Sequence, residues 1–280
     1  MSPGSRQPGE VAASTLLRAA TVARIPYLNA EPFYAHWSAL PGTTVDRVPR
    51  RLGEEAERGA VDAGLMAVVD ALRLADTFER LGPFGVACDG AVESVLLLHG
   101  GSLDALAGGR IWLTGESSTS VRLCRLLLER HLGLAGLRYE RRDFDAAALP
   151  GASPPEGEAW LVIGDAALVA RRDRPKARML DLGAAWKAWT GRPFVYAVWA
   201  VRRALPEELK RGLAQFLETS LSDGLAQLDA IAAAYAERTA GRMGTAADLR
   251  RYLERFTYRL GPAEEAGLTL FAERARENAT

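Results

Sequence analysis

Short apolar runs alternate with helix-like patterns along the first two thirds of the chain. Apolar runs bounded by Gly, Pro, Asn or Asp are typical of strands, and apolar positions three or four residues apart are typical of helices. The expected strands are 21–27, 45–48, 60–66, 85–88, 94–99, 110–114, 138–142, 159–163 and 194–201. The expected helices among them are 31–40, 49–58, 68–74, 118–131 and 166–170. This alternation predicts an α/β fold, and its first part, up to about residue 99, is expected to contain a mostly parallel sheet.

The last quarter of the chain has a different, helical pattern. The expected helices there are 206–240, with a break near 222–224, then 245–255 and 262–276. At roughly 150 residues per domain, the length of 280 residues suits two lobes. We expect a first lobe built from residues 21–100 and 190–280, with a second lobe, 101–189, inserted into it. Residues 1–20, rich in Ser, Gly, Pro and Gln, are expected to form a disordered leader.

Charge and composition exclude several classes of function. Lys and Arg total 35 and Asp and Glu total 35, so no basic excess exists to bind nucleic acid or an anionic membrane. The longest apolar runs, such as 195–201, are far shorter than the ~18 residues of a membrane span. Because a secretory signal and a cysteine framework are also missing, we expect a cytoplasmic protein, monomeric or homodimeric, without nucleic-acid or membrane partners.

The usual catalytic constellations are scarce. The three histidines, His36, His99 and His131, form no metal-binding pair, and the sequence has no Walker loop, no GxGxxG and no GxSxG. The two cysteines, Cys88 and Cys124, are expected to be buried small hydrophobic residues rather than nucleophiles. We therefore expect no metal site and no cofactor.

Two polar stretches indicate a ligand site. Asn29 follows the first expected strand, and open α/β sheets bind ligands at the carboxyl ends of their strands. Asn29 suits helix capping equally well, so both interpretations stay open. The second stretch places four consecutive hydroxyls, 117–120, at the start of an expected helix, beside free backbone N–H groups. Because one cap needs one hydroxyl, Ser117, Thr119 and Ser120 favour a carboxylate or phosphate site over capping alone.

A third stretch, 186–199, places aromatic runs on both sides of a Thr-Gly-Arg-Pro turn. Most of its aromatic side chains are expected to pack in the core. Phe194, at the junction of turn and strand, is expected at a cleft between the lobes, where ligands commonly bind.

Seven short motifs follow one another along residues 22–201. They are Tyr27-Leu28-Asn29, Asp62-Ala63-Gly64-Leu65, Glu93-Ser94-Val95, Ser117-x-Thr119-Ser120-Val121, Ile163-Gly164-Asp165-Ala166-Ala167-Leu168, Asp181-Leu182-Gly183 with Trp186, and Thr190-Gly191-x-Pro193-Phe194-Val195-x-Ala197-x-Trp199. Each motif is weak alone, but the ordered set is specific. Together they resemble the chorismate dehydratase family of the futalosine route to menaquinone.

The resemblance implies a fold like the type II periplasmic binding proteins, with two α/β lobes, a hinge and a cleft that closes on a small anion. It also implies a reaction in which chorismate loses its C4 hydroxyl and C3 hydrogen to give 3-[(1-carboxyvinyl)oxy]benzoate. Two alternatives stay open: the 1,4-dihydroxy-6-naphthoate synthase of the same pathway, and a non-catalytic small-anion binding protein. The Ile-Gly-Asp and Thr-Gly-x-Pro-Phe stretches favour the dehydratase.

The resemblance also implies a set of site residues. Asn29 would be the central catalytic residue, bonding the C4 hydroxyl region or the enolpyruvyl carboxylate, and that carboxylate could itself act as the base. Ser94 would be the second catalytic residue, in contact with the substrate at the hinge. For Asp165, an N-cap role for the helix 166–170 is at least as good an interpretation. The implied substrate-binding residues are Tyr27, Met66, Ser117, Thr119, Ser120, Gly164, Asp165 and Phe194.

Overall fold

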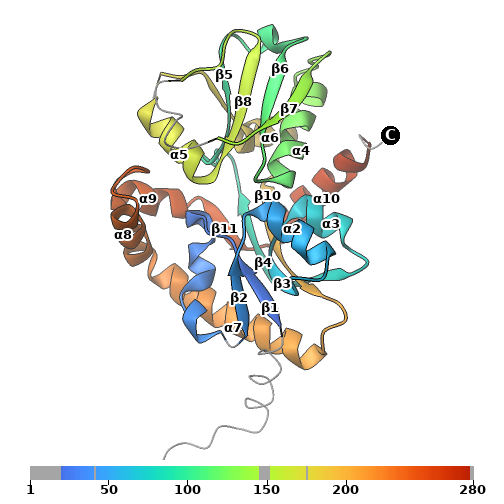
Figure 1. Ribbon diagram of the computed structural model, residues 1–280, viewed down its shortest axis with the longest axis vertical. Helices are drawn as coiled ribbons and strands as arrows, with labels where there is room; N and C mark the ends of the chain where they lie inside the picture. Colours follow the sequence, from blue (N-terminus) through green and yellow to red (C-terminus); the bar gives the residue numbers. More distant parts are fainter. Residues whose placement is uncertain (1–19, 41, 145–151, 175, 278–280) are drawn as a thin grey trace, which may run out of the picture.

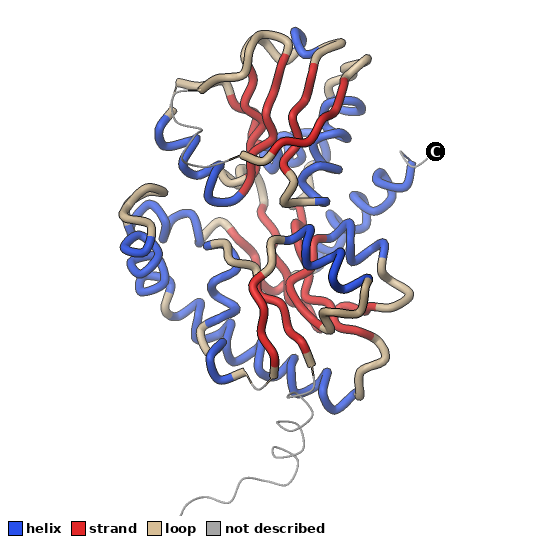
Figure 2. The backbone as a smooth tube through the Cα atoms, in the orientation of Figure 1, coloured by secondary structure: helices blue, strands red, loops and turns tan. Residues whose placement is uncertain are grey.

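The computed structural model describes residues 20–40, 42–144, 152–174 and 176–277. It shows two α/β lobes that follow one another along the longest axis of the molecule (Figure 1). In both lobes the strands lie inside and most helices lie outside (Figure 2). The expected leader falls almost entirely on residues 1–19, which lie outside the described residues.

The first lobe contains a six-stranded sheet with the order β11-β4-β10-β3-β1-β2. Its strands are β1 (Thr21–Arg24), β2 (Thr43–Asp46), β3 (Ala63–Ala67), β4 (Phe78–Cys88), β10 (Phe194–Arg202) and β11 (Phe256–Arg259). β1 pairs in parallel with β2 and β3, but β10 runs antiparallel between β3 and β4. The expectation of a mostly parallel sheet is therefore wrong here, because β10 enters the sheet from the side of the second lobe.

The second lobe contains a five-stranded sheet with the order β7-β6-β8-β5-β9. Its strands are β5 (Val95–His99), β6 (Arg110–Thr114), β7 (Arg138–Arg142), β8 (Glu158–Ile163) and β9 (Met179–Asp181). The expected lobe boundary after residue 100 placed β5 in the first lobe, whereas β5 pairs with β8 and β9. The chain thus first crosses between the lobes before Val95.

The helices agree with the apolar periodicity except near the N-terminus and at residues 182–190, where no helix was expected. The α-helices are α2 (Pro49–Glu57), α3 (Val68–Arg73), α4 (Ser118–Leu126), α5 (Gly164–Asp173), α6 (Leu182–Thr190), α7 (Glu207–Ala226), α8 (Leu228–Arg238), α9 (Ala246–Leu253) and α10 (Pro262–Glu277). Shorter turns are η1 (Leu28–Tyr34), η2 (Trp37–Ala39), η3 (Asp104–Leu106) and the π-helical η4 (Leu127–His131). The helix expected at 31–40 is thus two 3₁₀ turns, because Pro32 disfavours a regular α-helix there.

The C-terminal helices hold the segment that follows β1. α7 packs against η1, where Ser220 donates a hydrogen bond from its Oγ to the carbonyl oxygen of Phe33 at 2.8 Å. Gly224 of α7 allows this approach, because a Cβ at that position would lie 2.0 Å from the carbonyl oxygen of Pro32. The helical tail therefore positions η1, which carries Asn29.

Candidate active site between the lobes

Loops from three strands meet where the lobes face each other. The adjacent strands β1 and β3 connect in opposite directions, β1 to β2 at one edge of the sheet and β3 to β4 toward the other edge, as at the ligand-binding switch point of open α/β sheets. Tyr27 and Asn29 follow β1, Glu116 follows β6, and Gly164 and Asp165 follow β8. Residues far apart in sequence are thereby brought to one inter-lobe region.

Tyr27 joins the two lobes through Glu116. Its hydroxyl donates a hydrogen bond to Glu116 Oε2 at 2.7 Å. Burial raises the pKa of Tyr27, and the negative charge of Glu116 raises it further. The hydroxyl therefore stays protonated at neutral pH and remains a donor.

Asp165 accepts a second hydrogen bond that joins the two lobes. Tyr235, on α8 of the first lobe, donates its hydroxyl to Asp165 Oδ2 at 2.9 Å. Burial raises the pKa of Asp165 to about 6, although the bond from Tyr235 and the charge of Arg238 act in the opposite direction. The alternative N-cap role is wrong: the N-cap of α5 is Ile163, and Asp165 lies in the first helical turn.

Ser94 is buried at the hinge between β4 and β5. Tyr252, on α9, donates its hydroxyl to Ser94 Oγ at 2.8 Å, and the N–H of Gly164 donates to the carbonyl oxygen of Ser94 at 2.8 Å. The remaining proton of Ser94 meets only the carbonyl oxygen of Val92, at 3.4 Å, among the described residues. That bond is long and therefore weak.

The hydroxyls at the start of α4 bond to protein groups in this structure. Ser117 caps the helix by accepting a hydrogen bond from the N–H of Ser120 at 3.1 Å. Thr119 Oγ1 accepts from the N–H of Val69 at 3.1 Å, at the start of α3. The bond between Val69 and Thr119 joins the first lobe to the second. The expected anion site at Ser117, Thr119 and Ser120 stays a prediction.

The remaining expected site residues have different surroundings. Asn29 is partly exposed on η1, and its side chain makes no hydrogen bond with any residue that the structure describes. The N-cap of η1 is Tyr27, so Asn29 does not cap this helix. Met66 and Phe194 are 0% and 1% exposed. Phe194 packs 4.9 Å from Phe271, between ring centroids, which is a core position rather than the cleft position expected from sequence.

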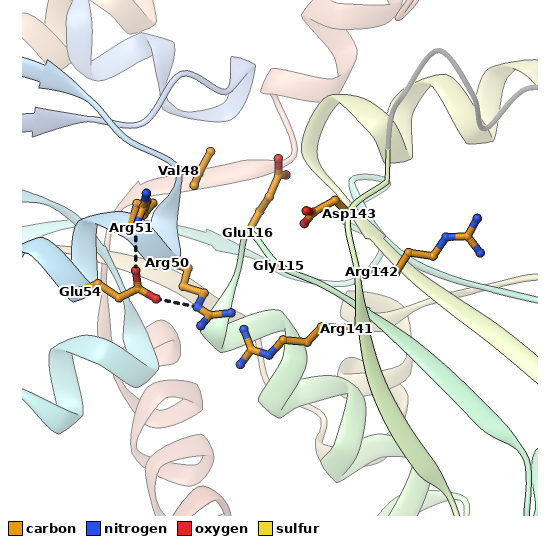
Figure 3. A pocket seen from close by; sticks show the side chains of 9 residues that line it. All are labelled: Val48, Arg50, Arg51, Glu54, Gly115, Glu116, Arg141, Arg142 and Asp143. Carbon is orange, nitrogen blue, oxygen red and sulfur yellow. Dashed lines mark hydrogen bonds and ion pairs between the residues drawn. The ribbon is translucent and has the colours of Figure 1, made fainter.

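Two cavities flank this inter-lobe region. One, of about 460 Å³, lies between α2 and the end of β7 and is lined in part by Gly115 and Glu116 (Figure 3). The other, of about 590 Å³, is lined in part by Glu93, Leu168 and Tyr252. Glu116, the partner of Tyr27, therefore lines one cavity, and Tyr252, the partner of Ser94, lines the other.

Sequence reasoning missed three of these residues. Glu116 directly precedes the hydroxyl stretch 117–120, so its position beside the expected anion site was a usable signal of a functional residue. Tyr235 and Tyr252 belong to helices in the tail, 70 and 158 positions from their partners Asp165 and Ser94. No local pattern marks either tyrosine.

Within the described ranges, no three His, Cys, Asp or Glu residues lie together in a way that could hold a metal ion. No helix in those ranges is both long and apolar enough to cross a membrane.

The fold defines the class of protein. A crystal structure of an Archaeoglobus fulgidus protein superposes with a TM-score of 0.76 at 18% identity, over 93% of this chain and 97% of that chain. The periplasmic aliphatic sulphonate binding protein of Escherichia coli gives a TM-score of 0.61 at 16% identity, over 94% and 88%. The chain therefore has a periplasmic-binding-protein-like fold, as the sequence predicted.

Sequence comparison identifies the family. The model of a family described as menaquinone biosynthesis matches residues 20–277. The chain is also 36% identical over 264 residues to the chorismate dehydratase of Thermus thermophilus, covering 88% of this chain and 92% of that protein. This chain belongs to the menaquinone biosynthesis family, which confirms the resemblance inferred from the ordered motifs.

Proposed function

We propose that this chain is a chorismate dehydratase that eliminates water from chorismate to give 3-[(1-carboxyvinyl)oxy]benzoate. The observation that carries the proposal is the similarity to the Thermus thermophilus chorismate dehydratase over most of both chains. We place the reaction in the futalosine route to menaquinone and the protein in the cytoplasm.

The elimination requires little from the enzyme beyond orienting the substrate. The C3–H electron pair becomes a ring π bond as the C4–O bond breaks, and the leaving hydroxyl takes a proton to become water. Because an aromatic ring forms, much of the driving force lies in the substrate. A buried site that orients chorismate and excludes water supplies what remains. The inter-lobe bonds Tyr27–Glu116 and Tyr235–Asp165 suit such an enclosed site.

Each proposed role follows from a hydrogen bond in the structure or from a polar side chain without a hydrogen-bond partner among the described residues. Asn29 has an unpaired amide within the described residues and bonds the C4 hydroxyl region or the enolpyruvyl carboxylate. That carboxylate accepts the C3 proton, so no protein base is required. Ser94 donates its weakly held proton to a substrate oxygen beside Gly164.

The substrate carboxylates are proposed to lie near helix starts. The first turn of α4 offers backbone N–H groups and the positive end of the helix dipole, which hold a carboxylate without Lys or Arg. Ser117, Thr119 and Ser120 belong to this turn. We propose that one carboxylate of chorismate is received there.

The test is direct conversion. Purified protein is incubated with chorismate, and the product is followed by ultraviolet absorbance and mass, with heat-denatured protein as the control. The expected product is aromatic and lighter than chorismate by one water. Binding of chorismate without conversion would support the non-catalytic binding protein. Consumption of the cyclic futalosine derivative, with chorismate untouched, would support the naphthoate synthase.

A further inference from the structure

The 460 Å³ cavity brings together charged side chains from both lobes. Arg50 reaches it from α2 of the first lobe, and Arg141 reaches it from β7 of the second. Figure 3 shows the two guanidinium groups pointing toward each other across the space between α2 and β7. The lobes touch at its edge, where the N–H of Arg50 donates to the carbonyl oxygen of Glu116 at 3.0 Å.

On the first-lobe side, the single carboxylate of Glu54 forms ion pairs with two arginines. Arg50 Nε donates to Glu54 Oε1 at 2.9 Å, and Arg51 Nη1 lies 3.5 Å from Oε2. Desolvation raises the pKa of Glu54, but the hydrogen bonds and charges of Arg50 and Arg51 outweigh it and hold this pKa below its usual range. One positive charge therefore remains uncompensated beside the cavity.

On the second-lobe side, Arg141 is exposed and has no hydrogen bond or ion pair with any residue that the structure describes. Its neighbour Arg142 lies over the ring of Trp160, 5.2 Å from the centroid, and points away from the cavity (Figure 3). The acidic side chains of Glu116 and Asp143 lie on the other side of the space from the two facing guanidinium groups (Figure 3). Arg141 thus faces Arg50 without an anion between them.

Two guanidinium groups on opposite lobes repel each other unless an anion lies between them. A carboxylate fits this position, because the planar donor fork of arginine matches its two oxygens. The cavity borders the candidate active site at Glu116, which lines the cavity and accepts the hydroxyl of Tyr27.

We propose that Arg50 and Arg141 form a capture site for a dicarboxylate at the mouth of the inter-lobe region. The identity of that dicarboxylate as chorismate rests on the proposed function. A chain with a formal net charge of zero has no overall field to attract a dianion. A local pair of arginines supplies that attraction and speeds association.

The kinetic test uses Arg141→Ala and Arg50→Ala, with Arg138→Ala as the matched control. Arg138 is exposed on the same strand, β7, and does not line the cavity. At low ionic strength, each cavity variant should lower kcat/KM for chorismate about tenfold or more while kcat stays within about twofold. Near 1 M salt the difference from wild type should shrink, because screening then acts over roughly 3 Å. Arg138→Ala should match wild type throughout.

A binding test separates this proposal from the proposed function. Isophthalate, an aromatic dicarboxylate, is titrated into the same four proteins by calorimetry, which needs no turnover. Weaker binding to Arg141→Ala and Arg50→Ala, but not to Arg138→Ala, supports the capture site even if wild type fails to convert chorismate. The capture site is overturned if isophthalate binds all four proteins equally or binds none. Wild-type kcat/KM and salt dependence in Arg141→Ala would also overturn it.

Discussion

Three buried or nearly buried tyrosine hydroxyls surround the candidate site, and each donates to an oxygen from a distant part of the chain. Tyr27 donates to Glu116, Tyr235 to Asp165 and Tyr252 to Ser94. Burial raises the pKa of each phenol, so all three remain protonated donors at neutral pH. Each phenol has one proton and already donates it to a protein oxygen. The three tyrosines therefore fix the positions of Glu116, Asp165 and Ser94 around the site.

The first prediction at this scale concerns Asn29. Asn29→Ala should lower kcat for chorismate several-hundred-fold, which corresponds to about 3.5 kcal/mol of lost transition-state stabilisation. Because Asn29 bonds no described protein group, its loss should leave the melting temperature nearly unchanged. Steady-state kinetics and thermal melting of the same preparation check both parts. Full turnover by Asn29→Ala would show that the assignment is wrong.

The second prediction treats Tyr252 as a positioning residue for Ser94. Tyr252→Phe should lower kcat/KM about fivefold, because Ser94 loses the donor that fixes its hydroxyl, a bond worth about 1 kcal/mol. Added to Ser94→Ala, the same change should have no further effect.

A nearby tyrosine provides the control for Tyr252. Tyr258 is also buried, but its hydroxyl has no partner among the described residues. Tyr258→Phe should therefore keep both kcat/KM and the melting temperature of wild type. Additive losses in the double variant of Tyr252 and Ser94, or an equal loss in Tyr258→Phe, would contradict the positioning role.

The third prediction follows from the raised pKa of Asp165. Its folded-state pKa is about 6, above the ~3.9 of an unfolded aspartate, so the folded protein binds more protons between these values. Its stabilising contribution is full below about pH 4 and is lost as the pH rises through 6. Asp165→Asn should therefore melt about 2–6 °C higher than wild type at pH 7.5 and show little difference at pH 4. A difference that is the same at both pH values would exclude this linkage.

At the scale of elements, the sequence predicted some strands to the residue and missed others. The strands at 110–114 and 138–142 match β6 and β7 residue for residue. β9 and β11 were missed because their three and four residues form strands only by pairing with β5 and β4. The antiparallel direction of β10 was not predictable from its own residues, because it depends on where the chain returns from the second lobe.

The fourth prediction concerns the start of α5. Gly164 has a φ of +57°, and a Cβ there would lie 3.2 Å from the ring of Tyr27. Gly164→Ala should cost about 1–2 kcal/mol of stability through backbone strain, displace Tyr27 and raise KM for chorismate.

Gly133 is the matched control for Gly164. Its φ is +67°, but a Cβ there would meet no atom within 4 Å. Gly133→Ala should show a similar loss of stability, measured by chemical unfolding, with an unchanged KM. Equal KM values for the two variants would separate Gly164 from the substrate site.

At the scale of the whole molecule, residues from distant parts of the sequence lie together near the hinge between the lobes. Ordered motifs in the sequence identified Tyr27, Ser94, Gly164 and Asp165, which the fold brings together. The tyrosines that bond Ser94 and Asp165 could not be predicted, because their helices carry only an ordinary amphipathic pattern. The net charge of zero likewise gave no sign of the two arginines that face each other across the cavity, because composition counts charges but not their positions.

The last prediction concerns lobe closure at Glu93. Its Oε1 lies 3.1 Å from Arg171 of the second lobe and 2.7 Å from Arg255 of the first. Its φ of +64° is strained for a residue with a side chain, and Asp181 holds it by accepting the N–H of Glu93 at 2.7 Å. Glu93→Gln removes the charge that attracts both arginines. The ligand-free protein should then populate a more open arrangement, with a radius of gyration larger by about 1 Å.

Small-angle scattering measures this change, and the control is Glu218→Gln. Glu218 pairs with Arg259 at 2.5 Å, and both residues belong to the first lobe, so its loss leaves the inter-lobe contacts intact. Chorismate should compact Glu93→Gln again but with a higher KM, because part of the binding energy is then used to close the lobes. Identical scattering from the two variants would mean that Glu93 does not hold the lobes together, and that Tyr27–Glu116 and Tyr235–Asp165 suffice to close them.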